Sequence, residues 1–155
     1  MTDRTQLQTA KQTLPDDAGG PFVVLACLAN QAATDFDGML LRIEGFVSGI
    51  VVEPPFDDEL RANVVLAVMF NAGSTTTDKI LNVWGTPPGD LKELVAEGTI
   101  QFTGGGTYAN SITPISIPVN RAGTMWFDVE LDEKVMTRFA VQIIHEAVPE
   151  QAHTA

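Results

Sequence analysis

Few residues in this chain are of the types that support nucleophilic catalysis. It has two histidines and one cysteine. Cys27 lies in the apolar run Phe22–Leu28, which favours a small buried core residue over a nucleophile. His145 ends the last predicted strand, and His153 lies near the end of the sequence. A catalytic base would have to be His145, but its position is typical of a solvated side chain at a strand end.

Three glycine-containing motifs superficially match known functional loops, but each lacks a residue or a spacing that the loop requires. Asp35-x-Asp37-Gly38 begins like a calcium loop, but Phe46 occupies the twelfth position, where a closing glutamate is needed. Ser48 has the wrong spacing from its flanking glycines for a nucleophile elbow. The run Gly104–Gly106 has no Lys-Ser/Thr ending, so it is not a phosphate loop. We therefore expect no cofactor, no metal site and no catalytic residue, and predict that the protein is not an enzyme.

Exposed aromatic side chains are the better candidates for function. Trp84, Trp126 and Tyr108 could form a platform for a sugar or a protein partner, because aromatic rings are favoured at interfaces. Trp126 points away from the apolar set of its own strand, so it lies either on the solvent face or under another element. Ile115 lies in Ser111–Val119, whose two prolines predict an edge strand or an irregular segment. We take Trp126, Ile115, Trp84 and Tyr108 as candidate interaction residues.

Charge limits the partners that the chain can bind. The 155 residues include 20 Asp and Glu against 9 Lys and Arg, for a formal charge of −11. Such a chain repels phosphate backbones and anionic lipid, and its basic residues form no stripe. Nucleic acid and membrane are therefore not expected as partners. A protein partner or self-association into an oligomer is the expectation that remains.

Hydropathy predicts a cytoplasmic protein. The first residues show no apolar signal segment, and no stretch approaches the roughly 18 apolar residues of a membrane span. A single cysteine also excludes an intrachain disulfide.

The chain is predicted to fold as one domain with two flexible tails. Residues 1–20 and 147–155 are polar and have no apolar period, which is typical of mobile segments. Between them, residues 21–146 form strand-length apolar runs separated by Gly and Pro turns. A break near Gly45 and Gly49 predicts that 39–52 kinks or splits. The one expected helical turn covers Asp90–Ala96, with Asp90 as its cap.

The hairpin formed by residues 125–143 is the clearest pattern. Met125, Phe127, Val129 and Leu131 alternate with polar residues, and a second alternating run follows Asp132–Lys134. A three-residue turn would pair Leu131 with Val135 and thus Phe127 with Phe139, and would place Asp128 opposite Arg138. The side chains predicted to be buried are Phe127, Val129, Leu131, Phe139, Val141 and Ile143.

These elements predict an all-β fold, namely an antiparallel β-sandwich (Ig-like or jelly-roll-like) of about seven or eight strands. A partly open barrel is the alternative.

The hairpin resembles the end of an uncharacterised bacterial family of small β-sandwich proteins. The similarity rests on Gly123–Lys134 followed by Thr137–Val141, and on the layout of Asp37–Phe46, Val64–Phe70 and the Pro88-Gly89 turn. It covers about residues 22–145. This chain has Glu133 where the family has a turn glycine, and Ala140 where it has proline. The resemblance implies the fold and carries no activity.

Two functions remain open from the sequence. One is a non-catalytic binding or assembly module that acts through protein–protein contacts. The alternative is a carbohydrate-binding or hydrolytic domain that uses surface aromatics and carboxylates. A fold alone does not separate them, because function belongs to sites and one fold carries many.

Overall fold

A computed structural model describes residues 19–34 and 41–147, and about two thirds of these residues lie in strands. Nine strands follow one another in the described part of the chain. Their bounds are β1 Phe22–Thr34, β2 Leu41–Val47, β3 Gly49–Val52, β4 Arg61–Asn71, β5 Lys79–Thr86, β6 Glu93–Ile100, β7 Tyr108–Pro118, β8 Gly123–Leu131 and β9 Lys134–His145. The predicted tails and the Asp35–Gly38 turn lie outside the described residues, apart from Gly19, Gly20 and Ala147.

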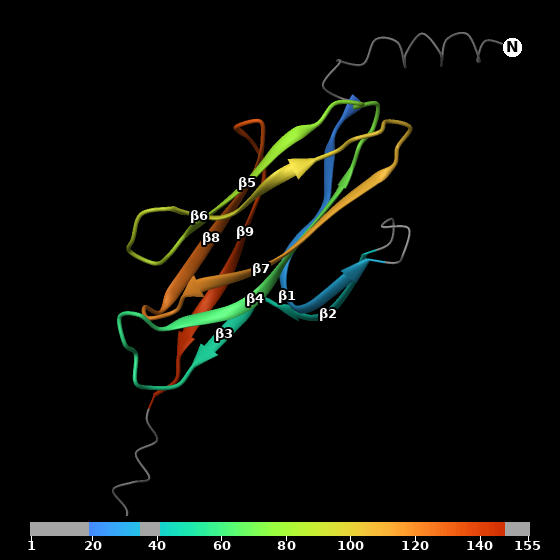
Figure 1. Cartoon of the computed structure of the whole chain (residues 1–155). Helices are drawn as coiled ribbons and strands as arrows, with labels where there is room; N and C mark the ends of the chain where they lie inside the picture. Colours follow the sequence, from blue (N-terminus) through green and yellow to red (C-terminus); the bar gives the residue numbers. More distant parts are fainter. Residues whose placement is uncertain (1–18, 35–40, 148–155) are drawn as a thin grey trace, which may run out of the picture.

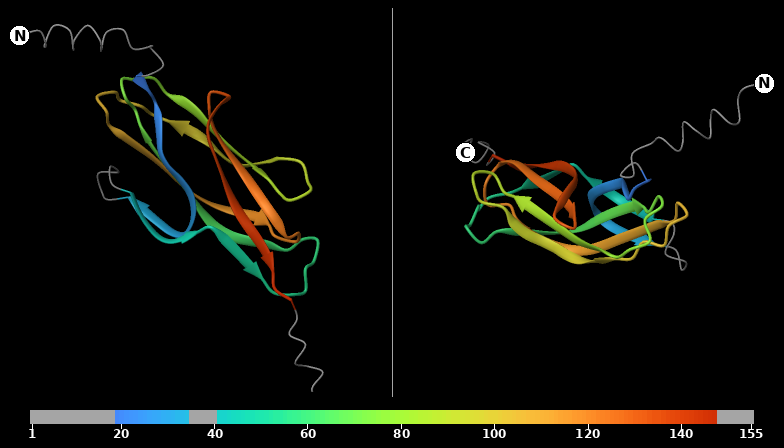
Figure 2. Two further views of the ribbon diagram at one scale, coloured as in Figure 1. Left: turned by 180° about the vertical axis from the view of Figure 1, so that it is seen from behind. Right: turned by 90° about the horizontal axis from the view of Figure 1, so that it is seen from above.

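The strands form two sheets (Figure 1). Sheet A has the order β2-β1-β4-β7, and sheet B has the order β3-β9-β8-β5-β6. All pairs are antiparallel except β3 with β9, which is parallel. The expectation of a purely antiparallel fold is therefore wrong at this edge. β2 and β3 are separated by Ser48 alone, so the chain passes directly from one sheet to the other (Figure 2).

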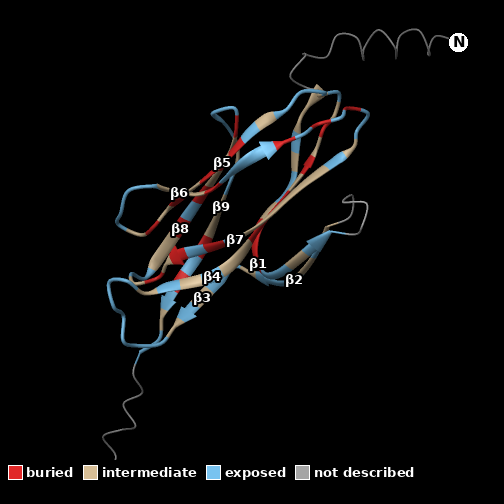
Figure 3. Ribbon diagram, viewed as in Figure 1, coloured by how far each residue is buried: buried red, intermediate tan, exposed pale blue. Residues whose placement is uncertain are grey.

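Buried side chains from both sheets form one hydrophobic cluster. Figure 3 shows where the buried residues lie along the strands. On β4, the alternate residues Leu66, Val68 and Phe70 belong to it, and on β8 Met125, Phe127, Val129 and Leu131 do. This is the period of two expected of strands with one buried face. The face of each sheet that points away from this cluster is called its outer face below. Within the described ranges, no helix is long and apolar enough to cross a membrane.

The C-terminal hairpin has the predicted pairing but a different turn. Leu131 pairs with Lys134, so the turn contains two residues, Asp132 and Glu133, with φ of 46° and 67°. Such left-handed turns match the twist of paired strands. An irregularity between Val129 and Glu130 then restores the predicted register.

The predicted cross-strand pairs of this hairpin are confirmed, and so are its predicted buried residues with one exception. Phe127 pairs with Phe139, Met125 with Val141 and Asp128 with Arg138. Five of the six side chains predicted to be buried are buried, whereas Phe139 is only half-buried and packs at the margin of the cluster.

The helical turn predicted at Asp90–Ala96 is wrong. Strand β6 begins at Glu93, and Leu94 pairs with Trp84 on β5. Pairing along a neighbouring strand overrides the weak local preference for helix in so short a segment.

Candidate interaction surfaces

The two tryptophans lie close together on the outer face of sheet B. Trp126 on β8 pairs with Thr86 on β5, and Trp84 lies two residues before Thr86 on the same strand. Diagonal positions of this kind lie roughly 7–8 Å apart, with their Cβ atoms somewhat closer, which is within reach of aromatic rings. The structure thus brings together two of the four candidate residues.

Trp84 is held in place by its neighbours. Its indole Nε1 donates a hydrogen bond to Oε1 of Glu130, with 3.0 Å between the atoms. Lys92 Nζ lies 4.6 Å from the ring centroid, in a cation–π contact. The side chain is half-buried. Trp84 therefore forms a fixed part of this face.

Trp126 has an open indole. It is 47% exposed, and its cross-strand neighbours are Thr86 and Ala140, which are too small to cover an indole. Two residues further along β8, Asp128 accepts hydrogen bonds from Arg138, at 2.5 Å from Nε and 3.4 Å from a terminal nitrogen. This contact and the negative charge of Asp128 raise the pKa of the Arg138 guanidinium.

The other two candidate residues lie in sheet A. Ile115 is only 6% exposed and belongs to the hydrophobic cluster. Strand β7 is an edge strand as predicted, but alternation turns the Ile115 side chain inward, so we correct its expected contact role. Tyr108, at the start of β7, is exposed and pairs with Asn71.

His145 is not the solvated strand-end residue that the sequence suggests. Its ring stacks on Phe56 with 3.8 Å between centroids, and Nε2 lies 2.9 Å from the carbonyl oxygen of Val119. The side chain is half-buried. These contacts connect the end of β9 to the loop after β3 and to the end of β7, which is a structural role.

The outer face of sheet A is a surface that the sequence analysis missed. Small residues line its centre and are almost fully shielded: Cys27, Ala29 and Ala67 are at most 2% exposed. Larger apolar residues pair with or flank them, and this set comprises Leu25, Phe46, Val65, Met69 and Ile112. The signal was in the sequence, because residues 22–29, 65–71 and 108–116 contain no charge.

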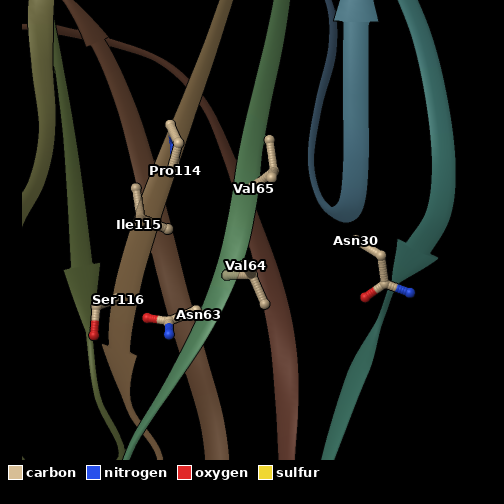
Figure 4. A pocket seen from close by; sticks show the side chains of 7 residues that line it. All are labelled: Asn30, Asn63, Val64, Val65, Pro114, Ile115 and Ser116. Atoms are coloured by element: carbon tan, nitrogen blue, oxygen red, sulfur yellow. The ribbon is translucent and has the colours of Figure 1, made fainter.

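A shallow open hollow of about 390 Å³ lies beside this face. It forms where β1 leaves β4: Ala29 pairs with Val65, and no β1 partner follows for Arg61–Val64. Asn30 lies across the gap from Val64 and Val65 (Figure 4). The hollow is lined by the amides of Asn30 and Asn63, the hydroxyl of Ser116 and apolar side chains, and none of its lining residues is ionisable.

Among the described residues, no three His, Cys, Asp or Glu side chains are grouped so that they could hold a metal ion. Both carboxylates nearest the tryptophans already have partners, since Asp128 binds Arg138 and Glu130 binds Trp84. Burial raises the pKa of the Cys27 thiol, which disfavours the thiolate.

Neither a scan against protein-family models nor a search of curated proteins finds a match to this chain. The resemblance to the bacterial β-sandwich family stays a prediction.

Proposed function

We propose that this protein is a non-catalytic binding module that contacts another protein through the outer face of sheet B. The observation that carries this proposal is the open indole of Trp126 beside the fixed indole of Trp84. Tryptophan is among the residues that contribute most to binding at interfaces, above all where neighbouring groups hold it in place. Both tryptophans stand on strands of a sheet, so binding a partner requires little further ordering of these side chains.

The chemistry around Trp126 favours a partner with a basic surface. The chain carries a formal charge of −11, so a cationic surface is attracted to it at long range. Arg and Lys side chains also stack on indoles, and Lys92 already makes this contact with Trp84. The exposed ring of Trp126 offers the equivalent position to a partner.

The experiment compares the proteins retained by immobilised wild type, Trp126→Ser and the control Val24→Ser. Val24 is exposed and apolar like Trp126, but it lies on strand β1 of sheet A. We expect a partner from the native host extract that the wild type and the control retain and Trp126→Ser loses by at least about tenfold, equivalent to 1.4 kcal/mol. Equal retention by all three proteins would contradict the proposal.

Carbohydrate binding is the second candidate, because polar groups surround the same ring. Thr124 Oγ1 donates to Gln142 Oε1 at 3.1 Å, and the Asp128–Arg138 pair lies on the other side of Trp126 along β8. Stacking on an indole combined with such groups suits a sugar ring. A titration with soluble polysaccharides that shifts the tryptophan fluorescence of wild type, but not of Trp126→Ser, would favour this candidate over a protein partner.

We further propose that the two sheets pack face to face as a β-sandwich. The single cluster with members from both sheets supports this, as does the direct passage from β2 to β3. The proximity of the edge strands β6 and β7 fits a sandwich that is partly closed on that side.

A further inference from the structure

We propose that sheet A binds an extended, basic peptide strand of a partner protein in the opening between β1 and β4. This opening, called the fork below, separates residues 30–34 of β1 from residues 61–64 of β4, and it contains the hollow of Figure 4. Trp84 and Trp126 lie on the other sheet, so the inference does not depend on the proposed function.

The backbone of β4 directs hydrogen-bonding groups into the fork. The N–H of Val119 donates to the carbonyl oxygen of Leu60 at 3.0 Å, and the pairing of β4 with β7 continues from there without a shift of register. Residues of an antiparallel strand bond alternately to one neighbour and to the other. Residues 60, 62 and 64 therefore bond to β7, whereas the N–H and C=O groups of Arg61 and Asn63 face the fork.

The prolines of β7 agree with this assignment. Pro114 lies opposite Val65 and Pro118 opposite Arg61. Both are positions where the alternation requires no N–H from β7, and proline has none to donate.

The β1 wall of the fork has the same property. Ala29 is the last residue of β1 that pairs with β4, and β1 then continues in register with β2 as far as Thr34. By the same alternation, the N–H and C=O groups of Gln31 and Ala33 point into the fork. No strand of the described ranges pairs with either wall on this side. An extended peptide is the ligand that satisfies such rows of backbone groups.

The core-facing side of the fork determines the sequence pattern of this peptide. Ala62 and Val64 pack against the hydrophobic cluster but are only half-buried. In an added strand, the side chains opposite these two residues point to the same side of the sheet, so apolar groups there would bury further apolar surface. The side chains opposite Arg61 and Asn63 point to solvent. We therefore expect apolar and polar residues to alternate in the bound strand.

Charge favours a basic strand over a second copy of this chain. The formal charge of −11 attracts a cationic segment at long range and repels another copy. The cation of the β4 wall, Arg61, is held on the β7 side. Its Nε donates to Ser116 Oγ at 3.0 Å, and a terminal nitrogen donates to the Ser116 carbonyl at 2.7 Å and to Glu93 at 3.3 Å. Lysines at the ends of the peptide thus meet no free cation on this wall.

A synthetic peptide tests the inference. The probe alternates valine with threonine between terminal lysines, and the control peptide carries a methyl group on each threonine nitrogen, which removes the donors that would face β4. Asn63→Pro removes the N–H that faces the fork without removing a bond to β7, whereas Asn63→Ala keeps it. In calorimetric titrations up to about 1 mM peptide, we expect wild type, Asn63→Ala and Trp126→Ser to bind the probe equally, and Asn63→Pro to bind at least about tenfold more weakly. The methylated peptide should bind wild type as weakly.

Hydrogen exchange of wild type, followed by NMR for each amide, keeps the test decisive if Asn63→Pro does not fold. The probe should slow exchange of the Arg61 and Asn63 amides. Absence of binding, equal binding of the methylated peptide or equal binding by a folded Asn63→Pro would overturn the proposal. Loss of binding by Trp126→Ser would also overturn it, because the peptide would then lie on sheet B. Protection of the two amides that grows with protein concentration in the absence of peptide would assign the fork to a second copy instead.

Discussion

The stacked rings of Phe127 and Phe139 differ in burial although they form one pair. Their centroids are 4.9 Å apart, but Phe127 is fully buried and Phe139 is at the margin of the cluster. Truncation should therefore cost less at Phe139. We expect Phe127→Ala to lower the free energy of unfolding by about 3–5 kcal/mol and Phe139→Ala by roughly half as much, as measured by urea unfolding. A larger loss at Phe139 would contradict this assignment of the core.

Cys27 predicts a dependence of stability on pH. Burial raises the thiol pKa of the folded chain above the ordinary value of 9.0, so the unfolded chain loses this proton first as pH rises. The contribution to stability is complete below pH 9.0 and is lost as pH rises through the folded pKa. Between about pH 8 and about pH 10, wild type should lose more unfolding free energy than Cys27→Ala. Equal losses in the two proteins would show that burial does not affect this thiol.

Single residues show where the sequence was sufficient for the candidate site and where it was not. Alternation predicted that Trp126 points away from the buried side chains of its own strand, but it did not decide whether the ring is exposed or lies under another element. In the structure the ring is 47% exposed. Alternation was not applied to Ile115, whose burial depends on which face of β7 meets the cluster. The stacking of His145 on Phe56 joins residues 89 positions apart, and no local pattern contains such information.

At the scale of elements, the β8–β9 turn predicts a gain in stability from one substitution. Glu133 adopts a φ of 67°, which costs a residue other than glycine roughly 1–2 kcal/mol. Glu133→Gly removes this cost, and we expect stability to rise by about 1 kcal/mol after the greater flexibility of the unfolded glycine chain is subtracted. Thermal and urea unfolding measure the change.

Lys134→Gly serves as the control, because Lys134 pairs with Leu131 in the strand and glycine there should destabilise the protein. If Glu133→Gly is neutral or destabilising, the two-residue turn is wrong and the three-residue turn of the sequence analysis is favoured again.

The positions of the strands, and the pairing within one hairpin, were easier to predict than the pairing of strands that are far apart in the sequence. The break at Gly45–Gly49, the edge position of β7 and the Phe127–Phe139 pairing all follow from local composition or alternation. The parallel β3–β9 pair does not, because it joins segments that are about 90 residues apart and depends on the direction in which the chain leaves Ser48. Strand β6 was missed for a similar reason, as its pairing with β5 lies outside its own sequence.

For the whole molecule, the excess of negative charge predicts a stabilising effect of salt. A formal charge of −11 opposes the compact state through repulsion, and the ion pairs of the described residues are on the surface, where each adds little. Raising NaCl from about 10 mM to about 300 mM shortens the screening distance severalfold. We expect the urea midpoint to rise. A midpoint that falls as salt is raised would show that attractive surface pairs, and not net repulsion, dominate the electrostatics.

The positions of the first and last strands bear on how the molecule responds to tension. Strand β1 begins at one end of the molecule and β9 finishes at the opposite end (Figure 1). A pull on these two ends would therefore draw β1 along β4, and β9 along β8 and β3, in the direction of the strands. Ladder bonds run across the strands, so many would have to break together before either strand slides. We expect such a molecule to withstand stretching better than one whose strands could be peeled apart bond by bond.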